Sequence, residues 1–276
     1  MVFTNQYSII PIFHDSRKNG ARRMLNIISI ILGAIVGSFL NVCIVRLPKE
    51  ESIVRPGSHC PHCNNPIKFY DNIPLISYLL LRGRCRHCKK SISLQYPLIE
   101  GVTAISSLLL FLRYGPSLSY LFYFSFVAAL TIMTVIDLYH QIIPDVISLP
   151  GIGVGLLGAL VIPHITFFNS LMGILLGGGS LFVVATLYQW LFKREGMGGG
   201  DVKLLAMIGA FLGWDAVILT ILFSSLIGSI TGVFIMVLKG KDFKYAIPFG
   251  PFLSLGALIA LFYKSEILSW YLQFRG

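Results

Sequence analysis

The stretch Leu118–Ile136 reads LSYLFYFSFVAALTIMTVI, contains no charged residue and ends directly at Asp137. About 20 apolar residues are enough to cross the hydrocarbon core of a bilayer as a helix. The stretch is therefore predicted to span a membrane, with Asp137 at the point where the membrane meets the following loop. A carboxylate at membrane depth is energetically costly, so Asp137 is a candidate functional residue.

The rest of the chain repeats this pattern of long apolar stretches separated by short charged windows. It is 55% hydrophobic and 12% charged, with a mean hydropathy of +0.77, which is typical of an integral membrane protein. We expect an all-α polytopic membrane protein with about eight transmembrane helices. The uncharged stretches are Met24–Val45, Gly101–Leu112, Leu118–Ile136, Val146–Pro163, Ile165–Phe192, Leu204–Trp214, Ala216–Leu238 and Tyr245–Tyr263.

Two of these stretches are short for a membrane span. Gly101–Leu112 can be extended at its start by Tyr96–Glu100. Leu204–Trp214 has a charged residue on either side, Lys203 and Asp215. We expect this segment to form a short, tilted or partly re-entrant helix, which a membrane tolerates only where other helices surround it.

Basic residues are divided unequally between the two sides of the membrane. One set of loops holds 15 of the 22 Lys and Arg residues and the other holds 7, so the positive-inside rule places the richer set in the cytoplasm. Four basic residues before position 24 argue for the opposite orientation. The net charge of +10 is interpreted as topology and contact with anionic lipid, and not as nucleic-acid binding. The loops expected in the cytoplasm are 46–97, 137–145, 193–203 and 239–244.

Two C-x-x-C pairs lie in the loop after the first apolar stretch. Cys60 and Cys63 form one pair, Cys85 and Cys88 form the other, and 21 residues separate the pairs, which is close to the spacing of four-thiolate zinc sites. We expect one structural Zn²⁺ that folds a loop too small to build its own core. Two disulfides are the alternative, and they would require an oxidising compartment. Cys43 is interpreted as a small buried residue of the first span.

These features predict four parts of the chain. Residues 1–23 are an N-terminal extension, 24–45 the first transmembrane helix, 46–97 a cytoplasmic zinc-binding module, and 98–276 a membrane-embedded domain. Residues 1–45 superficially resemble a signal peptide, but the apolar run is too long and no small-residue cleavage site follows it. The first span is therefore expected to be retained.

A second carboxylate, Asp201, follows a run of glycines. Two carboxyl groups that share one proton can activate water, because one accepts a proton from water while the other polarises the carbonyl under attack. Glycines leave bare backbone against which an extended peptide can lie. Asp137 and Asp201 are therefore candidate catalytic residues for peptide hydrolysis. The candidate substrate-binding residues are Gly198, Gly199, Gly200 and Lys203.

Several of these residues also have simpler structural interpretations. Asp145 precedes a helical stretch, and capping that helix is favoured over catalysis. Asp201 is placed equally well to cap a helix beginning at Val202. Lys203 either holds Asp201 ionised, meets charge on a bound peptide, or anchors a short helix at the cytoplasmic interface. The G-x-G-x-x-G run that starts at Gly153 lies inside an apolar stretch with no preceding soluble strand, so it fails as a nucleotide-binding motif.

Glycines four residues apart recur in the apolar stretches. This spacing is expected to let neighbouring helices approach closely. The pairs are Gly33/Gly37, Gly173/Gly177, Gly209/Gly213 and Gly228/Gly232.

Taken in order along the chain, these motifs resemble those of the type IV prepilin peptidases. The resemblance extends from about residue 36 to about residue 260. A GxGD box alone also occurs in presenilin-like proteases, whereas the full ordered set is specific. The set comprises Ser38-Phe39-Leu40-Asn41-Val42, Arg46-Leu47-Pro48, the two C-x-x-C pairs, Asp137 with Pro144-Asp145, Gly198-Gly199-Gly200-Asp201 with Lys203, and Pro248-Phe249-Gly250-Pro251.

The resemblance implies a bifunctional enzyme of the bacterial cytoplasmic (inner) membrane with its active site on the cytoplasmic side. Such an enzyme cleaves the short basic leader of type IV prepilins or type II secretion pseudopilins. It then N-methylates the new N-terminal residue with S-adenosylmethionine. The family's catalytic aspartates match Asp137 and Asp201.

Two alternatives belong to other functional classes. A non-enzymatic assembly factor or a transporter would use intramembrane aspartates to carry protons. A GxGD protease without methyltransferase activity would act on other membrane substrates. No Rossmann unit with a glycine fingerprint is present in the sequence, so the site for S-adenosylmethionine must be built from loops or helix ends.

Overall fold

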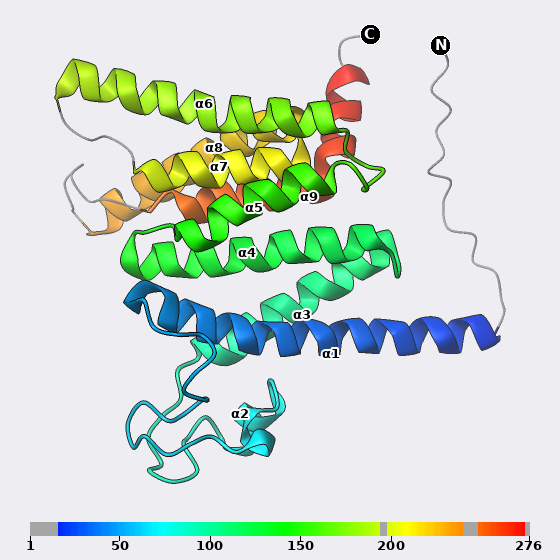
Figure 1. Cartoon of the computed structure of the whole chain (residues 1–276), viewed down its shortest axis with the longest axis vertical. Coiled ribbons are helices and arrows are strands. Elements are labelled where there is room, and N and C mark those ends of the chain that lie inside the picture. Colours follow the sequence, from blue (N-terminus) through cyan, green and yellow to red (C-terminus); the bar gives the residue numbers. More distant parts are fainter. Residues whose placement is uncertain (1–15, 194–197, 240–247, 274–276) are drawn as a thin grey trace.

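The computed structural model describes residues 16–193, 198–239 and 248–273. Regular structure within these ranges is helical, and the only extended pairing is two isolated bridges. Figure 1 shows the long helices side by side, with one largely irregular loop projecting below them. The predicted all-α architecture is confirmed.

Each apolar stretch of the sequence corresponds to one helix, although residues 245–247 of the last stretch lie outside the described ranges. The helices are α1 (Ser16–Arg46), α3 (Gln95–Tyr114), α4 (Leu118–His140), α5 (Asp145–Gly158), α6 (Phe167–Phe192), α7 (Gly199–Leu212), α8 (Trp214–Lys239) and α9 (Gly250–Gln273).

The expectation of about eight full crossings needs one refinement. Six helices of the described chain, α1, α3, α4, α6, α8 and α9, are long and apolar enough to cross a membrane. The helices α5 and α7 have 14 residues each, or about 21 Å at 1.5 Å per residue, which is shorter than a hydrocarbon core of about 30 Å. The chain is therefore a multi-pass membrane protein with six helices of full span length and two shorter ones.

The short helix α7 lies in the centre of the bundle. Every residue from Leu204 to Leu212 is buried, and α7 packs against α5, α6, α8 and α9. Its side chains share one core with α4, in which the Phe126 and Phe211 rings stack. This surrounding protein explains how a helix too short to span the bilayer is accommodated in it.

Close helix contacts occur at several of the predicted glycine pairs. A Cβ on Gly37 would lie 2.7 Å from the Cα of Glu100, so α1 and α3 meet backbone to backbone. Gly173 of α6 and Gly209 of α7 face each other so closely that a Cβ on either would collide with the carbonyl of the other. At Gly228, by contrast, a Cβ would make an ordinary 3.5 Å contact with Phe252.

The loop between α1 and α3, residues 47–94, is called the loop module below. It contains the short helix α2 (Ile76–Leu80) and two 3-10 turns, Leu47–Lys49 and Phe69–Asn72. Figure 1 places the loop module beneath the C-terminal end of α1 and the N-terminal end of α3. The same end of the bundle holds the C-terminus of α4 and the N-termini of α5, α7 and α9.

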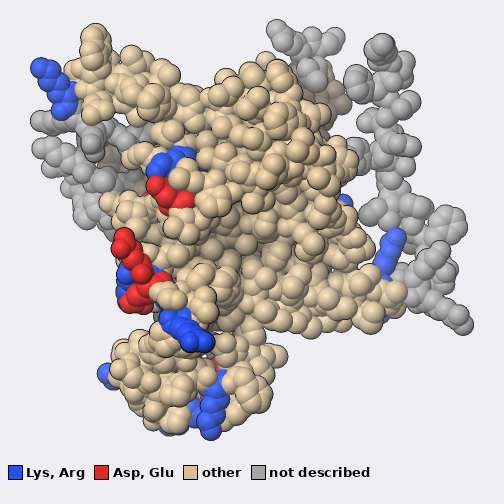
Figure 2. All heavy atoms as spheres, in the orientation of Figure 1, with Lys and Arg blue, Asp and Glu red and all other residues tan. Residues whose placement is uncertain are grey.

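Charged side chains follow this arrangement. On the face shown in Figure 2, they gather on the loop module and at the helix ends near it, with a few more at the opposite ends. The band between these regions shows no charged atoms on this face. This apolar band is consistent with the six helices that are long and apolar enough to cross a membrane.

Candidate active site and metal centre

Asp137 lies in the last turn of α4 and is only 5% exposed. The helix ends three residues later, at His140, because Gln141 adopts a left-handed conformation and donates its N–H to the Asp137 carbonyl. Oδ2 of the Asp137 carboxyl group accepts a hydrogen bond from the backbone N–H of Gly250, with a donor–acceptor distance of 3.0 Å. Gly250 is the first residue of α9, where backbone N–H groups have no partner within the helix.

The contact between these two residues requires glycine. A Cβ on Gly250 would lie 2.6 Å from Oδ2 of Asp137, closer than any side chain tolerates. The backbone at the start of α9 therefore positions the Asp137 carboxyl group directly, with no side chain between them.

Asp201 lies in the first turn of α7 and is partly buried. The structure brings Asp201 and Asp137 into one region, because Gly200, next to Asp201, and Gly250, which binds Asp137, both lie against Ile143. Ile143, in the loop after α4, links the two helix starts. A Cβ on Gly200 would lie 3.0 Å from the Cβ of Ile143, and a Cβ on Gly250 would lie 3.4 Å from its Cδ1.

The glycines before Asp201 have two kinds of surroundings. Gly198 and Gly199 are exposed, and a Cβ on Gly199 would meet no atom within 4 Å. Packing inside the protein therefore does not require glycine there. Gly200 differs because Ile143 covers it.

Asp145 and Lys203 form an ion pair across α5 and α7. Lys203 Nζ lies 2.7 Å from both carboxylate oxygens of Asp145. The expectation that Asp145 caps α5 is wrong, because Pro144 is the N-cap residue and no side chain caps the helix. Asp201 does not cap its helix either, since α7 begins at Gly199. The partner of Lys203 is thus Asp145, 58 residues away in the chain.

The four cysteines of the loop module converge on one point. Their Sγ atoms all lie within 4.8 Å of one another. Each pair is held in the same turn, in which the first cysteine's carbonyl accepts a hydrogen bond from the residue four positions on, Asn64 or Lys89. Both of these residues are left-handed, which turns the chain back so that two thiols face one ion. These residues are Cys60, Cys63, Cys85 and Cys88.

The spacing of the thiols fits a tetrahedral metal. A metal–sulfur distance of about 2.3 Å gives about 3.8 Å between sulfurs in a tetrahedral zinc site, and Sγ of Cys60 lies 3.8 Å from Sγ of Cys88. None of the five cysteines of the chain forms a disulfide in the structure. Backbone N–H groups of Cys88 and His87 lower the pKa of the Cys85 thiol to about 7, which favours the thiolate form that binds metals.

An ion pair joins the two halves of the loop module. Arg86 donates from Nε and one terminal nitrogen to the two carboxylate oxygens of Asp71, with distances of 2.8 and 2.6 Å. These bonds with Arg86 hold the pKa of Asp71 below its usual range. The guanidinium also lies over the ring of Tyr70 at 5.5 Å from its centre.

Two buried charged residues attach the loop module to the membrane helices. Arg46, at the end of α1, donates to the carbonyl of Ser52 at 2.9 Å and to that of Pro56 at 2.7 Å. Glu100 of α3 accepts the backbone N–H of Leu75 at 2.7 Å. Both residues are less than 10% exposed.

Two family models match consecutive parts of the chain. Residues 31–114 match the bacterial peptidase A24 N-terminal domain, and residues 124–233 match the type IV leader peptidase family. No solved structure matches the chain.

Curated relatives align with most of the chain. A prepilin leader peptidase/N-methyltransferase of Pseudomonas aeruginosa is 38% identical over 271 residues, covering 90% of this chain and 93% of the relative. The chain belongs to the type IV leader peptidase family. A relative of the same name from Aeromonas hydrophila is 37% identical over 270 residues, covering 88% of this chain and 92% of that protein.

The two family models divide the candidate residues between them. Asp137 and Asp201 lie in the segment that matches the leader peptidase family. The four cysteines, together with Arg46 and Glu100, lie in the segment that matches the N-terminal domain. These matches confirm the family that the sequence motifs predicted, the type IV prepilin peptidases.

Gly250 and Glu100 were not among the predicted site residues. A signal for Gly250 was present, since it lies in the Pro248-Phe249-Gly250-Pro251 motif. Glu100 entered the sequence analysis only as part of the extension of an apolar stretch, whereas the structure buries it and bonds it to the loop module. Arg46 was noted only as part of a motif, because the carbonyls that it binds follow it in an irregular loop.

Proposed function

We propose that this protein is a membrane aspartic peptidase that cleaves the leader of type IV prepilins or pseudopilins and then methylates the new amino terminus. The observation that supports the peptidase activity most directly is the position of Asp137. Its buried carboxyl group is fixed by the Gly250 N–H, and Ile143 lies against both Gly250 and Gly200, the residue next to Asp201. The names of the relatives, prepilin leader peptidase/N-methyltransferase, include both activities.

The two aspartates divide the chemistry of hydrolysis. In the productive state one carboxyl group is ionised and accepts a proton from the attacking water, while the other is protonated and polarises the scissile carbonyl. Two carboxyl groups that interact in a buried site disfavour the doubly charged state, so a single shared proton is the expected arrangement. Because the Gly250 N–H occupies Oδ2 of Asp137, Oδ1 is the oxygen left to orient the water.

The glycine run before Asp201 provides the approach for the substrate. Gly198 and Gly199 are exposed and need no glycine for packing, so their bare backbone is free to lie against an extended peptide. Gly200 brings this backbone close to Ile143 and the aspartates. Lys203 remains a predicted substrate-binding residue, positioned by Asp145 at the edge of the site.

The metal of the loop module is proposed to be a structural Zn²⁺. Four thiols at tetrahedral spacing form a closed ligand set that leaves no position for substrate. Its role is to fold a loop in which, among the described residues, only Cys60, Ser77 and Gly83 are buried, so that no large apolar side chain forms a core.

The methyl group is proposed to come from S-adenosylmethionine, and the protein to lie in the bacterial inner membrane. Reduced thiols and the excess of basic residues in one set of loops favour a cytoplasmic loop module. The C-terminal turn of α4 and the N-terminal turn of α7, which carry the aspartates, lie at the same end of the bundle as this module (Figure 1), so cleavage takes place at the cytoplasmic face. The basic loops contact anionic lipid, and prepilins are the protein partners.

One incubation tests both activities. Purified protein is mixed with a prepilin, with or without S-adenosylmethionine, and the product mass is measured. Loss of the leader mass without the donor, and a further gain of one methyl mass with it, is the expected result. Asp137→Asn and Asp201→Asn should each abolish cleavage while the protein still accumulates in the membrane. Full cleavage by both variants would refute the assignment and favour another role for the aspartates.

A further inference from the structure

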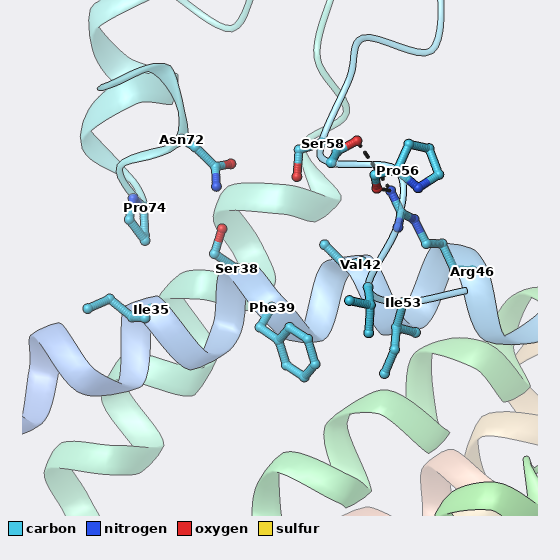
Figure 3. A pocket seen from close by; sticks show the side chains of 12 residues that line it. Ile35, Ser38, Phe39, Val42, Arg46, Ile53, Pro56, Ser58, Asn72 and Pro74 are labelled. Carbon is cyan, nitrogen blue, oxygen red and sulfur yellow. Dashed lines mark hydrogen bonds between the residues drawn. The ribbon is translucent and has the colours of Figure 1, made fainter. Parts of the chain in front are cut away.

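A cavity of about 360 Å³ lies between α1 and the loop module. Figure 3 shows Ser38 and Val42 rising from α1 toward two segments of the module, one with Asn72 and Pro74 and one with Pro56 and Ser58. Its volume is within the range of about 300–1,000 Å³ found for small-molecule sites. The wall combines apolar side chains with hydroxyl and amide groups, as such sites commonly do.

The cavity is separate from the aspartates. Its α1 residues, such as Ser38 and Val42, lie on a different face of the helix from Leu40 and Ile44. Those two residues pack against Ile136 of α4, directly before Asp137. The packed contact between α1 and α4 therefore stands between the cavity and the candidate peptidase site.

Every residue that lines the cavity lies between positions 35 and 74. This range falls inside the segment that matches the N-terminal domain, whereas both aspartates fall inside the leader peptidase segment. An activity that does not use the aspartates needs a site of its own. The cavity is a hollow of suitable size in the other domain.

A buried carboxyl group stands directly behind the cavity wall. Glu100 is 7% exposed and accepts the N–H of Leu75 at 2.7 Å. Its backbone packs against α1 at Gly37, next to Ser38, where an added Cβ would lie 2.7 Å from the Cα of Glu100. Ser38 lines the cavity, as does Pro74 next to Leu75. In the described part of the chain no Lys or Arg forms an ion pair with Glu100. The one charged side chain in the cavity lining, Arg46, already binds the carbonyls of Ser52 and Pro56. An unpaired buried carboxylate is costly, so a positively charged group beside Glu100 would be favoured.

We propose that this cavity binds the methyl donor, a sulfonium nucleoside, with Glu100 as the residue that positions its positive charge. The inference rests on the methyl-transfer half of the proposed function. The hydroxyl groups of Ser38 and Ser58 and the amide of Asn72 offer hydrogen bonds to the nucleoside, and Phe39 offers an aromatic face. Arg46 fixes the wall that carries Pro56 through its bonds to backbone carbonyls.

The reaction that this donor supports is a direct displacement. The lone pair of the new terminal amine forms a bond to the methyl carbon, and the carbon–sulfur bond breaks with its electron pair going to sulfur. The sulfonium becomes a neutral thioether, and the methylated amine releases one proton to water. No oxidant, reductant or metal takes part.

The test fills the cavity in the full-length protein and measures donor binding directly. Val42→Trp places a large side chain inside the cavity, and Val45→Trp is the matched control, since Val45 is 38% exposed and does not line the cavity. Binding of S-adenosylmethionine is measured by calorimetry on protein in nanodiscs. We expect Val42→Trp to weaken binding at least about tenfold, and Val45→Trp to leave it unchanged. Prepilin cleavage should persist in both variants.

Glu100→Gln tests the charge without removing the hydrogen-bond acceptor for Leu75. If Glu100 merely anchors the loop module, this variant should bind the donor as the wild type does. We expect donor affinity to fall about tenfold, with cleavage retained. Photolabelling of the wild type with an azido analogue of the donor gives a readout independent of folding defects, and the label should fall within residues 35–74.

The outcomes separate this inference from the function on which it rests. If the wild type methylates a pre-cleaved pilin but Val42→Trp and Glu100→Gln keep full donor affinity, the cavity assignment is wrong and the methyltransferase stands. If Glu100→Gln raises only the KM for the pilin peptide, the cavity binds the substrate amine instead, which also overturns the proposal. If the wild type neither binds the donor nor methylates, the methyl-transfer function itself fails.

Discussion

The backbone N–H of Gly250 donates a hydrogen bond of 3.0 Å to Oδ2 of Asp137, although the two residues are 113 positions apart in the chain. The bond joins the N-terminus of α9 to the C-terminal turn of α4. It fixes one oxygen of a buried carboxyl group at the start of a helix whose N–H groups favour negative charge. The position of the candidate catalytic group thus depends on a residue that lacks a side chain.

Gly250→Ala is expected to impair cleavage severely. The added Cβ would lie 2.6 Å from Oδ2, so the carboxyl group must move, and a displacement of about 1 Å can lower catalysis about 10²-fold. The measurement is kcat/KM for a prepilin, together with membrane abundance. Gly179→Ala is the control, because a Cβ there would meet nothing within 4 Å. Equal activity of the two variants would show that the Gly250 contact does not position Asp137.

The glycine run allows a second prediction, about substrate binding. Gly199 is exposed and its Cβ position is open, so Gly199→Val should leave folding and membrane abundance unchanged. A valine there would hold an extended peptide away from the backbone, so the KM for prepilin should rise about tenfold or more. Steady-state cleavage at several substrate concentrations measures this change. An unaltered KM would mean that the peptide approaches the aspartates by another route.

The sequence was informative where one local pattern carries the property. Charge-free stretches predicted where helices form, and the spacing of Cys60, Cys63, Cys85 and Cys88 predicted that their thiols share a site. Both properties depend on residues close together in the chain or on a turn of known geometry. The same reasoning anticipated that Leu204–Trp214 is short and enclosed by other helices.

The contacts that arrange the site could not be predicted in the same way. Lys203 pairs with Asp145, 58 residues earlier, and Glu100 binds the backbone of Leu75, 25 residues earlier. Lys203, Asp145 and Glu100 were each recognisable as a polar residue near a helix end. The group that each one binds, however, depends on how the helices pack. Asp145 was expected to cap α5 because its position in the sequence is typical of a capping residue. In the structure its carboxylate instead binds Lys203 of α7.

Removal of the metal provides a third prediction. The intact protein should contain one Zn²⁺ per chain, measured by elemental analysis, and Cys85→Ser should lose it. Because Ser58 of the cavity wall lies two residues before Cys60, unfolding of the loop module should impair methylation more than cleavage. Cys43→Ser is the control, since Cys43 lies apart from the cluster in α1. Unchanged zinc content in Cys85→Ser would contradict the assigned ligand set.

The ion pair between Arg86 and Asp71 should slow metal loss slightly. Arg86→Gln is expected to speed zinc transfer to a chelator by a few-fold at most, because an exposed ion pair contributes little stability. Arg84→Gln is the matched control, since Arg84 forms no ion pair within the described ranges. Arg86 lowers the pKa of Asp71, so Asp71 is ionised and the ion pair is present at neutral pH, where the exchange is measured. A larger effect of Arg84→Gln would refute this role.

The last prediction concerns whether the two activities can be separated. Cleavage requires Asp137 and Asp201, whereas methyl transfer requires a free amine and a bound donor but no pair of acids to activate water. Since α1 and its packing against α4 separate the cavity from the aspartates, Asp201→Asn should abolish prepilin cleavage and still methylate a supplied mature pilin at close to the wild-type rate. Mass spectrometry of unmethylated pilin incubated with the variant and S-adenosylmethionine measures this. Loss of both activities in a variant that retains its zinc and its donor affinity would mean that the aspartates also position the amine, and that the two sites work as one.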